Sequence, residues 1–244
     1  MPSKLVQASG LRKRFQQGRE WIWPLDGASL DVEKGEVLII RGHSGSGKTT
    51  LLCVLAGVLR PTEGTVFVCG EDLSHLDQRQ LGQLRLGNVG FVFQGANMVG
   101  DLTAAENVML VRRLLGDDRP SAARQASVLL DAVGLLERAS ALPRQMSAGE
   151  RQRAAFARAL ANKPAVIFAD EPTANLSSSG SACVAGLLRG MAKKDDASVV
   201  IATHDATLML IADRIVELDG GKLYGRSVES SIDPSYCPPH PPSK

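Results

Sequence analysis

The sequence predicts an α/β fold built on a mostly parallel sheet. Short apolar segments alternate along the chain with segments of helical spacing, the pattern of parallel strands joined by helical crossovers. Ligands bind such sheets at the carboxyl ends of the strands. Polar residues and a glycine end several of the apolar segments here, and they are Gly42, Gln94, Asp170, Glu171 and His204.

Length and composition indicate one large domain, or a domain with a subdomain. The 244 residues can bury a substantial core, and the fractions of hydrophobic (44%) and charged (22%) residues are ordinary for a soluble globular protein. A net charge of +2 gives no electrostatic reason to expect nucleic acid as a partner. The N-terminus lacks the apolar core of a secretion signal, and no apolar run approaches the about 18 residues of a membrane span. We therefore expect a cytoplasmic protein.

The N-terminal part predicts an antiparallel β subdomain. Residues 3–8 and 27–31 are expected to be strands, and the charged segment 12–20 is expected to be a turn between them. Phe15 lies in this region. It could stack on a nucleotide base or pack inside a β-hairpin, and spacing alone does not separate the two roles. Two nearby tryptophans are weaker candidates for stacking.

A glycine-rich loop lies between a predicted strand at 36–40 and a predicted helix at 49–57. It reads Gly42-His43-Ser44-Gly45-Ser46-Gly47-Lys48-Thr49-Thr50 and fits G-x-x-x-x-G-K-[ST], the phosphate loop of nucleotide-binding proteins. Glycines let successive N–H groups bend around a phosphate, Lys48 would contact the β- and γ-phosphates, and Thr49 would bind Mg²⁺. His43 is expected to contribute only its backbone N–H. The flanking strand and helix disfavour a flexible linker and predict a P-loop NTPase core.

The middle of the chain predicts a helical subdomain, at about residues 95–160, inserted into the α/β core. Apolar residues there recur at helical spacing, and Pro120 with Ser121 is typical of a helix start. The expected elements from the phosphate loop onward are a turn at 61–64, a strand at 65–70, a helix at 77–86, a strand at 89–93 and two or three helices across 104–139.

The last third predicts three strands, two helices and a tail. The elements are a helix at 150–162, a strand at 165–171, a helix at 178–193 and strands at 198–202 and 215–218. Asp170 follows apolar residues and suits a Mg²⁺ shell, and the adjacent Glu171 could take a proton from water or polarise it. Without the phosphate loop, this pair would be interpreted as a solvated strand end. Residues 225–244 are rich in serine and proline, which predicts disorder.

The order of these motifs resembles that of the ATP-binding subunits of ABC transporters over nearly all of residues 1–224. The motifs are an aromatic loop (Phe15), the phosphate loop (42–50), a Gln loop (Gln94), a signature (146–150), the Asp-Glu strand (166–171), a D-loop (174–177) and a switch histidine (His204). Within that family, residues 91–94, 102–108 and 171–176 are similar to the lipoprotein-release and macrolide-export group, the LolD-, MacB- and FtsE-like proteins.

The resemblance implies an ATPase with ATP and Mg²⁺ as its cofactors, working as a pair of subunits. Each ATP would lie between one subunit's phosphate loop and the other's signature. Gln94 would contact Mg²⁺ and the attacking water, and His204 the γ-phosphate. The second subunit could be identical or different. An integral-membrane permease, FtsX-like or MacB-like, would hold the protein at the cytoplasmic face of the membrane and use its motion for export or extraction.

The signature departs from the usual Leu-Ser-Gly-Gly-Gln of the family. It reads Met146-Ser147-Ala148-Gly149-Glu150, and a positive φ at Ala148 would be strained. Glu150 adds a negative charge near a phosphate, unless it points away or pairs with Arg151 or Arg153. Ser177 also replaces the usual Asp of the D-loop. We expect an active but slow ATPase. The alternative is a regulatory or structural ATP-binding module with very slow hydrolysis.

Two other classes of protein fit the sequence less well. Soluble ABC proteins of translation or DNA repair usually carry two cassettes or a long coiled-coil insertion, and this sequence shows neither. A small-molecule kinase would leave the signature at 146–150 unexplained.

Overall fold

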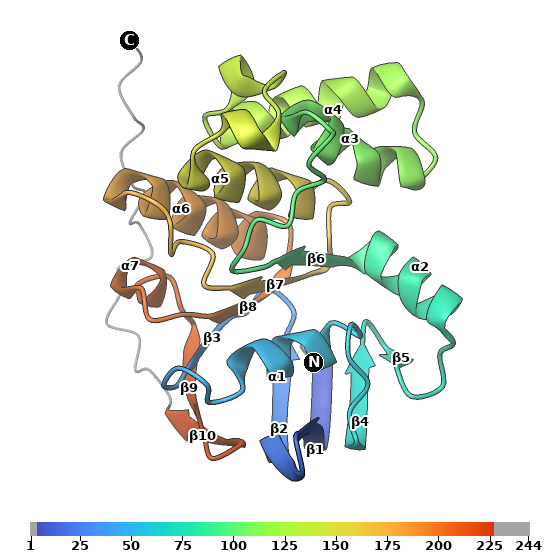
Figure 1. Cartoon of the computed structure of the whole chain (residues 1–244), viewed down its shortest axis with the longest axis vertical. Helices are drawn as coiled ribbons and strands as arrows, with labels where there is room; N and C mark the ends of the chain where they lie inside the picture. The colour runs from blue at the N-terminus through green and yellow to red at the C-terminus, as the bar shows by residue number, and fades with distance from the viewer. Residues whose placement is uncertain (1–3, 227–244) are drawn as a thin grey trace.

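The computed structural model describes residues 4–226, which form two sheets with helices around them (Figure 1). Of the tail predicted for 225–244, residues 225 and 226 belong to the last strand. Residues 227–244, the rest of the segment predicted to be disordered, lie outside the described residues, as do residues 1–3.

The larger sheet is almost entirely parallel and confirms the predicted α/β class. Its strand order is β10-β9-β3-β8-β7-β6, and only β10 runs antiparallel to its neighbour. The strands are β3 (Val37–Arg41), β6 (Val89–Val92), β7 (Val166–Asp170), β8 (Ser198–Ala202), β9 (Arg214–Asp219) and β10 (Lys222–Arg226). β10 was not predicted, because its polar, glycine-containing sequence has no strand pattern, and it forms as a hairpin on β9 after a Gly-Gly turn.

The smaller sheet is antiparallel, with the order β2-β1-β4-β5. Its strands are β1 (Lys4–Gln17), β2 (Glu20–Glu33), β4 (Glu63–Val68) and β5 (Glu71–Asp72). The predicted turn at 12–20 is wrong, since both strands continue to a turn at residues 18–19. The arginines of this segment stack on tryptophans of β2, with Arg12 4.6 Å from the centre of the Trp23 ring and Arg14 4.3 Å from that of Trp21. Cross-strand cation–π pairs thus make a charged sequence compatible with a strand.

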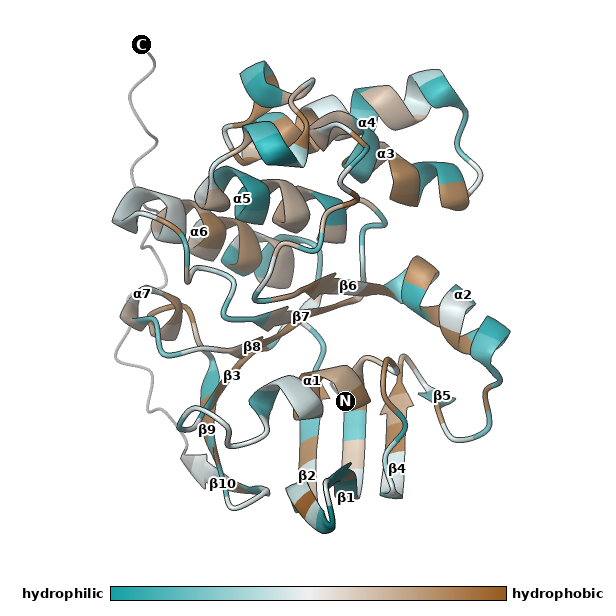
Figure 2. Cartoon of the chain, viewed as in Figure 1, coloured by the Kyte–Doolittle hydropathy of each residue, from teal (hydrophilic) through white to brown (hydrophobic). Residues whose placement is uncertain are grey.

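The two faces of the larger sheet are covered by different layers. In β3, Val37 and Ile39 join the core that includes α5 and α6, whereas Leu38 and Ile40 join the core that includes α1 and the smaller sheet. Such alternation explains why strands buried on both faces are continuously apolar, as the brown β6, β7 and β8 show in Figure 2. The helices at these faces are α1 (Lys48–Leu55), α5 (Ala148–Ala159) and α6 (Ser178–Lys194).

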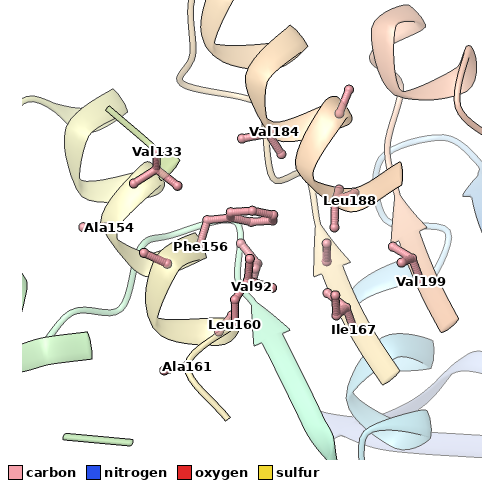
Figure 3. Packing of buried hydrophobic residues seen from close by; sticks show 14 of the residues in the cluster. Val92, Val133, Ala154, Phe156, Leu160, Ala161, Ile167, Val184, Leu188 and Val199 are labelled. Atoms are coloured by element: carbon pink, nitrogen blue, oxygen red, sulfur yellow. The ribbon is translucent and has the colours of Figure 1, made fainter. Parts of the chain in front are cut away.

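Packing between α5, α6 and the sheet forms the centre of the first core (Figure 3). Phe156 of α5 is 1% exposed and lies in one cluster with Val92 of β6, Ile167 of β7 and Leu188 of α6. A buried phenylalanine stabilises a fold by about 1.5–3 kcal/mol relative to its exposed state. This layer therefore sets the position of α5, whose first residues are the predicted signature.

The helical segment between β6 and β7 contains α3 (Ala104–Leu114), α4 (Arg119–Ala132), two 3₁₀ turns at Leu136–Arg138 and Pro143–Gln145, and α5. Polar side chains cap the N-termini of its helices. Thr103 and Glu106 form a reciprocal capping box before α3, and Asp118 accepts the N–H of Ser121 at the start of α4. The predicted start at Pro120 and Ser121 is thus confirmed, with Asp118 as the cap. The remaining helices are α2 (Gln78–Asn88) and the short α7 (Ala206–Met209).

Candidate functional site

The phosphate loop joins β3 to α1 and is tightly confined. Gly42, Gly45 and Gly47 all have positive φ, at 150°, 80° and 101°. A Cβ on Gly42 would lie 2.3 Å from the carbonyl oxygen of Leu218, and one on Gly47 would lie 2.3 Å from that of Pro24. The loop therefore fits between β9 and β2 only with glycine at these two positions.

Lys48 begins α1, and its side chain turns back under the loop. Its Nζ atom donates to the carbonyl oxygens of Gly42 (2.6 Å) and His43 (3.1 Å), and it lies 3.4 Å from Nε2 of His204. The residue is only 9% exposed. A lysine held here by carbonyls alone, without a carboxylate partner among the described residues, is a cation suited to an incoming anion.

Thr49 and Asp170 join the loop to the end of β7. The Thr49 hydroxyl donates to Oδ2 of Asp170 over 2.6 Å, and Asp170 is 4% exposed. Hard oxygen donors of this kind are the ligands that Mg²⁺ prefers, and Mg²⁺ usually takes only one or two carboxylates and completes its shell with water and phosphate oxygens. Residues 4–226 contain no cluster of three or more metal-binding His, Cys, Asp or Glu side chains. The donor set thus fits Mg²⁺ bound together with a phosphate.

A cavity of about 290 Å³ brings the separate motifs together. Its walls come from β2, the phosphate loop, α1 and the ends of β6, β7 and β8. The lining residues are Pro24, Ser44, Gly45, Gly47, Lys48, Thr49, Thr50, Gln94, Asp170, Glu171 and His204. Four of the five strand-ending residues singled out in the sequence therefore line this one cavity, and Gly42 is the exception.

Glu171 is held by the neighbouring strand. It has a positive φ of 43°, its N–H donates to the carbonyl oxygen of Ala202 (2.8 Å), and its Oε2 accepts the hydroxyl proton of Thr203 (3.0 Å). Thr203 is fully buried, and its oxygen also accepts the N–H of Asp205. Sequence analysis missed Thr203 as a site residue, although a hydroxyl directly before His204 at the end of a buried strand was a usable signal.

The loop that carries Gln94 is attached to α5. Gln152 donates to the carbonyl oxygen of Phe93 (3.1 Å), and Arg158 donates to those of Asn97 (2.8 Å) and Ala96 (3.2 Å). Burial lowers the pKa of the Arg158 guanidinium. These two anchors were also missed, because neither residue belongs to a recognisable motif.

Several predicted site residues lie away from the cavity. Phe15 is half-buried on β1 beside Lys13, whose Nζ is 5.2 Å from the ring centre. The side chain of His43 is exposed, with Nε2 3.5 Å from Oδ1 of Asp219. The hydroxyl of Ser46 is buried and has no hydrogen-bond partner among the described residues. The signature residues Ser147, Ala148, Gly149 and Glu150 form the start of α5, outside the cavity lining.

The structure corrects two expectations about the signature. Ala148 is the first residue of α5 and is not among the non-glycine residues of positive φ, so the predicted strain is wrong. Glu150 pairs with neither Arg151 nor Arg153. Its Oε1 lies 3.2 Å from Nε of Arg138, and its other oxygen accepts the N–H of Ser147 (2.7 Å).

Comparison with known proteins agrees with this geometry. Residues 25–174 match the family model described as ABC transporter. The lipoprotein-releasing system ATP-binding protein LolD of Xanthomonas axonopodis pv. citri is 42% identical over 219 residues, covering 90% of each chain. The LolD of Pseudomonas syringae pv. tomato is 39% identical over 219 residues, covering 90% of this chain and 96% of the relative.

A solved structure shares the fold. The ATP-binding cassette MJ0796, in a dimeric post-hydrolysis state bound to ADP and Pi, superposes with a TM-score of 0.89 at 33% identity, over 92% of this chain and 99% of the other. Family match, relatives and fold agree with the cavity and its motifs. The chain belongs to the family of ABC transporter ATP-binding proteins, and it is an ATPase that binds ATP and converts it to ADP and phosphate.

Proposed function

We propose that this chain is the motor subunit of an ABC transporter, which dimerises around two Mg-ATP and drives a membrane permease of the export or extraction type. The observation that carries the proposal is the shared cavity of Lys48, Asp170, Glu171, Gln94 and His204. A cation, carboxylates, an amide and an imidazole at one strand edge are the groups that phosphoryl transfer to water requires.

Each cavity residue has a role in this proposal. The loop N–H groups and Lys48 hold the phosphates, and Thr49, Asp170 and Gln94 hold Mg²⁺. The bound ion supplies positive charge that offsets the charge on the phosphate oxygens. Glu171, oriented by Thr203, accepts a proton from the attacking water, and His204 contacts the γ-phosphate beside Lys48.

Residues outside the cavity also contact the nucleotide in this proposal. Phe15, which pairs with Ile22 near the turn of the β1–β2 hairpin, stacks on the base. The signature of a second subunit, starting with Ser147, meets the γ-phosphate through the N-terminus of α5, where free N–H groups and the helix dipole favour an anion. The signature residues do not line the cavity of their own subunit, so they can contact the nucleotide of a second subunit, and this supports the arrangement.

Nucleotide binding then controls a large change in affinity between subunits. Moving an equilibrium from mostly open to mostly closed takes about 5.5 kcal/mol of differential binding. Charge-assisted hydrogen bonds contribute roughly 1.5–3 kcal/mol each, so a few contacts to the γ-phosphate suffice. Loss of the γ-phosphate removes those contacts and the subunits separate.

The partner is an integral-membrane permease, FtsX-like or MacB-like, and the second ATPase subunit is a second copy of this chain. No helix within residues 4–226 combines the length and apolar character needed to cross a bilayer. The LolD relatives, named for a lipoprotein-releasing system, support extraction of a membrane-embedded cargo. The ATPase would then sit peripherally at the cytoplasmic face, attached through the permease.

The test is phosphate release by the purified protein, alone and with the permease that co-purifies from solubilised membranes. We expect low turnover alone, stimulation by the permease and loss of both in Glu171→Gln. A protein that binds ATP but releases no phosphate with its membrane partner would instead be a regulatory module. Recovery of no membrane partner would contradict the transport proposal.

A further inference from the structure

The N-terminus of α5 carries a carboxylate of its own. Ser147 caps the helix by accepting the N–H of Glu150 (3.1 Å), and Glu150 reaches back to accept the N–H of Ser147 (2.7 Å). The Ser147 N–H is the largest cause holding the pKa of the Glu150 carboxyl below its ordinary value. A full negative charge therefore stands where the helix presents only about half a positive charge.

Arg138 lies against this carboxylate. It ends the 3₁₀ turn at Leu136–Arg138, and its Nε is 3.2 Å from Oε1 of Glu150. A second bond, from Nη2 to the carbonyl oxygen of Gln145 (2.6 Å), fixes the guanidinium beside the signature. Of the other nearby arginines, Arg151 donates to the carbonyl oxygen of Met146 at 2.6 Å. The charge of Arg153 also lowers the pKa of the Glu150 carboxyl, after that of Arg138, but Arg153 forms no ion pair with it among the described contacts.

We propose that Arg138 is a positioning residue that neutralises Glu150, so that the triphosphate of a second subunit can approach the start of α5. The inference rests on the proposed function, in which that triphosphate meets the signature. Without Arg138 the full charge of Glu150 outweighs the helix dipole, and the site repels an anion. With Arg138 the pair is neutral and the dipole again favours one.

A purely structural role for Arg138 makes different predictions. If the arginine served only to hold the 142–146 segment through Gln145, its loss would misplace the signature whatever residue stands at 150. If it serves by charge, removal of the Glu150 charge compensates for its loss. A charge effect also weakens with ionic strength, whereas loss of a local hydrogen bond does not.

The experiment measures the Mg-ATP-dependent dimer dissociation constant by sedimentation, in full-length protein that also carries Glu171→Gln. We expect Arg138→Gln to weaken dimerisation about fivefold or more, the effect of one unit charge a few ångströms away in a water-like medium. Adding Glu150→Gln should bring the constant back to within about twofold of the parent, and Arg138→Lys should retain it. Raising salt from about 0.05 to 0.5 M should reduce the Arg138→Gln defect.

The neighbouring Arg144 provides the matched control. It is exposed in the same segment and makes no ion pair with Glu150 among the described contacts, so Arg144→Gln removes the same charge and should change dimerisation less than about twofold. An Arg138→Gln protein that dimerises like its parent would overturn the proposal. So would a defect that neither Glu150→Gln nor salt relieves. Failure of the parent itself to dimerise would overturn the proposed function, and this role with it.

Discussion

The hydroxyl of Thr49 donates a 2.6 Å hydrogen bond to Oδ2 of Asp170, between residues 121 positions apart in the chain. Thr49 lies in the first turn of α1, and Asp170 ends β7, which lies between β8 and the edge strand β6 of the larger sheet. The bond joins the phosphate loop to the Asp-Glu strand. Two of the three side chains proposed to hold Mg²⁺ are thus already in contact within the folded chain.

Replacing the Thr49 hydroxyl should therefore separate phosphate binding from catalysis. Thr49→Val keeps the shape of the side chain but removes one proposed Mg²⁺ ligand and the bond to Asp170. We expect kcat to fall roughly hundredfold and the Mg²⁺ concentration for half-maximal activity to rise. Steady-state phosphate release over a Mg²⁺ titration measures both. Thr49→Ser, which keeps the hydroxyl, is the control, and equal activity of the two variants would contradict the assignment.

Thr203 should act on turnover through Glu171. Thr203→Val removes the hydroxyl that orients the carboxylate, so kcat should fall roughly tenfold or more, part of the 10²–10⁴ that a positioned base contributes. The KM for ATP should change little, because Thr203 does not line the cavity. Thr203→Ser should restore kcat. A variant whose KM rises while kcat is unchanged would place Thr203 in binding instead.

The helical start of α5 changes the expectation for Ala148. Since Ala148 is unstrained, Ala148→Gly should not accelerate ATP hydrolysis, and it should lower the free energy of unfolding by up to about 1 kcal/mol. Ser177→Asp is the contrasting variant. Ser177 caps α6 by accepting the N–H of Gly180, a role that Asp also fills, so the variant adds a D-loop carboxylate and should raise turnover. A rate gain in Ala148→Gly would refute the unstrained assignment.

Asp213 should make stability depend on acid pH. Partial burial raises its pKa, but hydrogen bonds from Arg189, the Val37 N–H and Lys193 outweigh that effect, and the pKa lies below its ordinary value of 3.8. The carboxylate therefore adds stability at pH above 3.8, and this contribution is lost as pH falls through the lower folded-state pKa.

Asp213→Asn should accordingly lower the free energy of unfolding at pH 7 by about 1–2 kcal/mol, a value reduced for the partial exposure of the site. The difference from the parent should shrink as pH falls below 3.8. Urea unfolding at a series of pH values measures it. The exposed Lys4–Asp31 pair offers the control, since Asp31→Asn should cost under about 1 kcal/mol. A pH-independent difference for Asp213→Asn would contradict the account.

Much of the fold could be predicted from local patterns, and the failures have physical causes. The strands β3, β7 and β8 were predicted because burial on both faces makes them apolar throughout. The extension of β1 and β2 through the charged segment was missed, because cross-strand stacking of Arg12 and Arg14 on tryptophans depends on the partner strand. β10 was missed for the same reason, since only its pairing with β9 makes it a strand.

For the candidate site, too, some residues could be predicted from the sequence and others were missed. Residues in motifs, such as Lys48 and Asp170, could be found from sequence because their chemistry fixes both residue type and spacing. Thr203 and Arg138 were missed because neither belongs to a recognisable motif, although the position of Thr203 directly before His204 was a usable signal. The expected partners of Glu150 were Arg151 or Arg153, which follow it in the chain, whereas a preceding 3₁₀ turn supplies the cation.

The central claim is that ATP joins two copies of this fold, and the mass of the Glu171→Gln protein in solution tests it most directly. Light scattering after gel filtration should give a monomer without nucleotide and with Mg-ADP, and a dimer with Mg-ATP. Lys48→Ala in the same background should remain monomeric with Mg-ATP. A Glu171→Gln protein that binds Mg-ATP yet stays monomeric at every concentration would contradict the account.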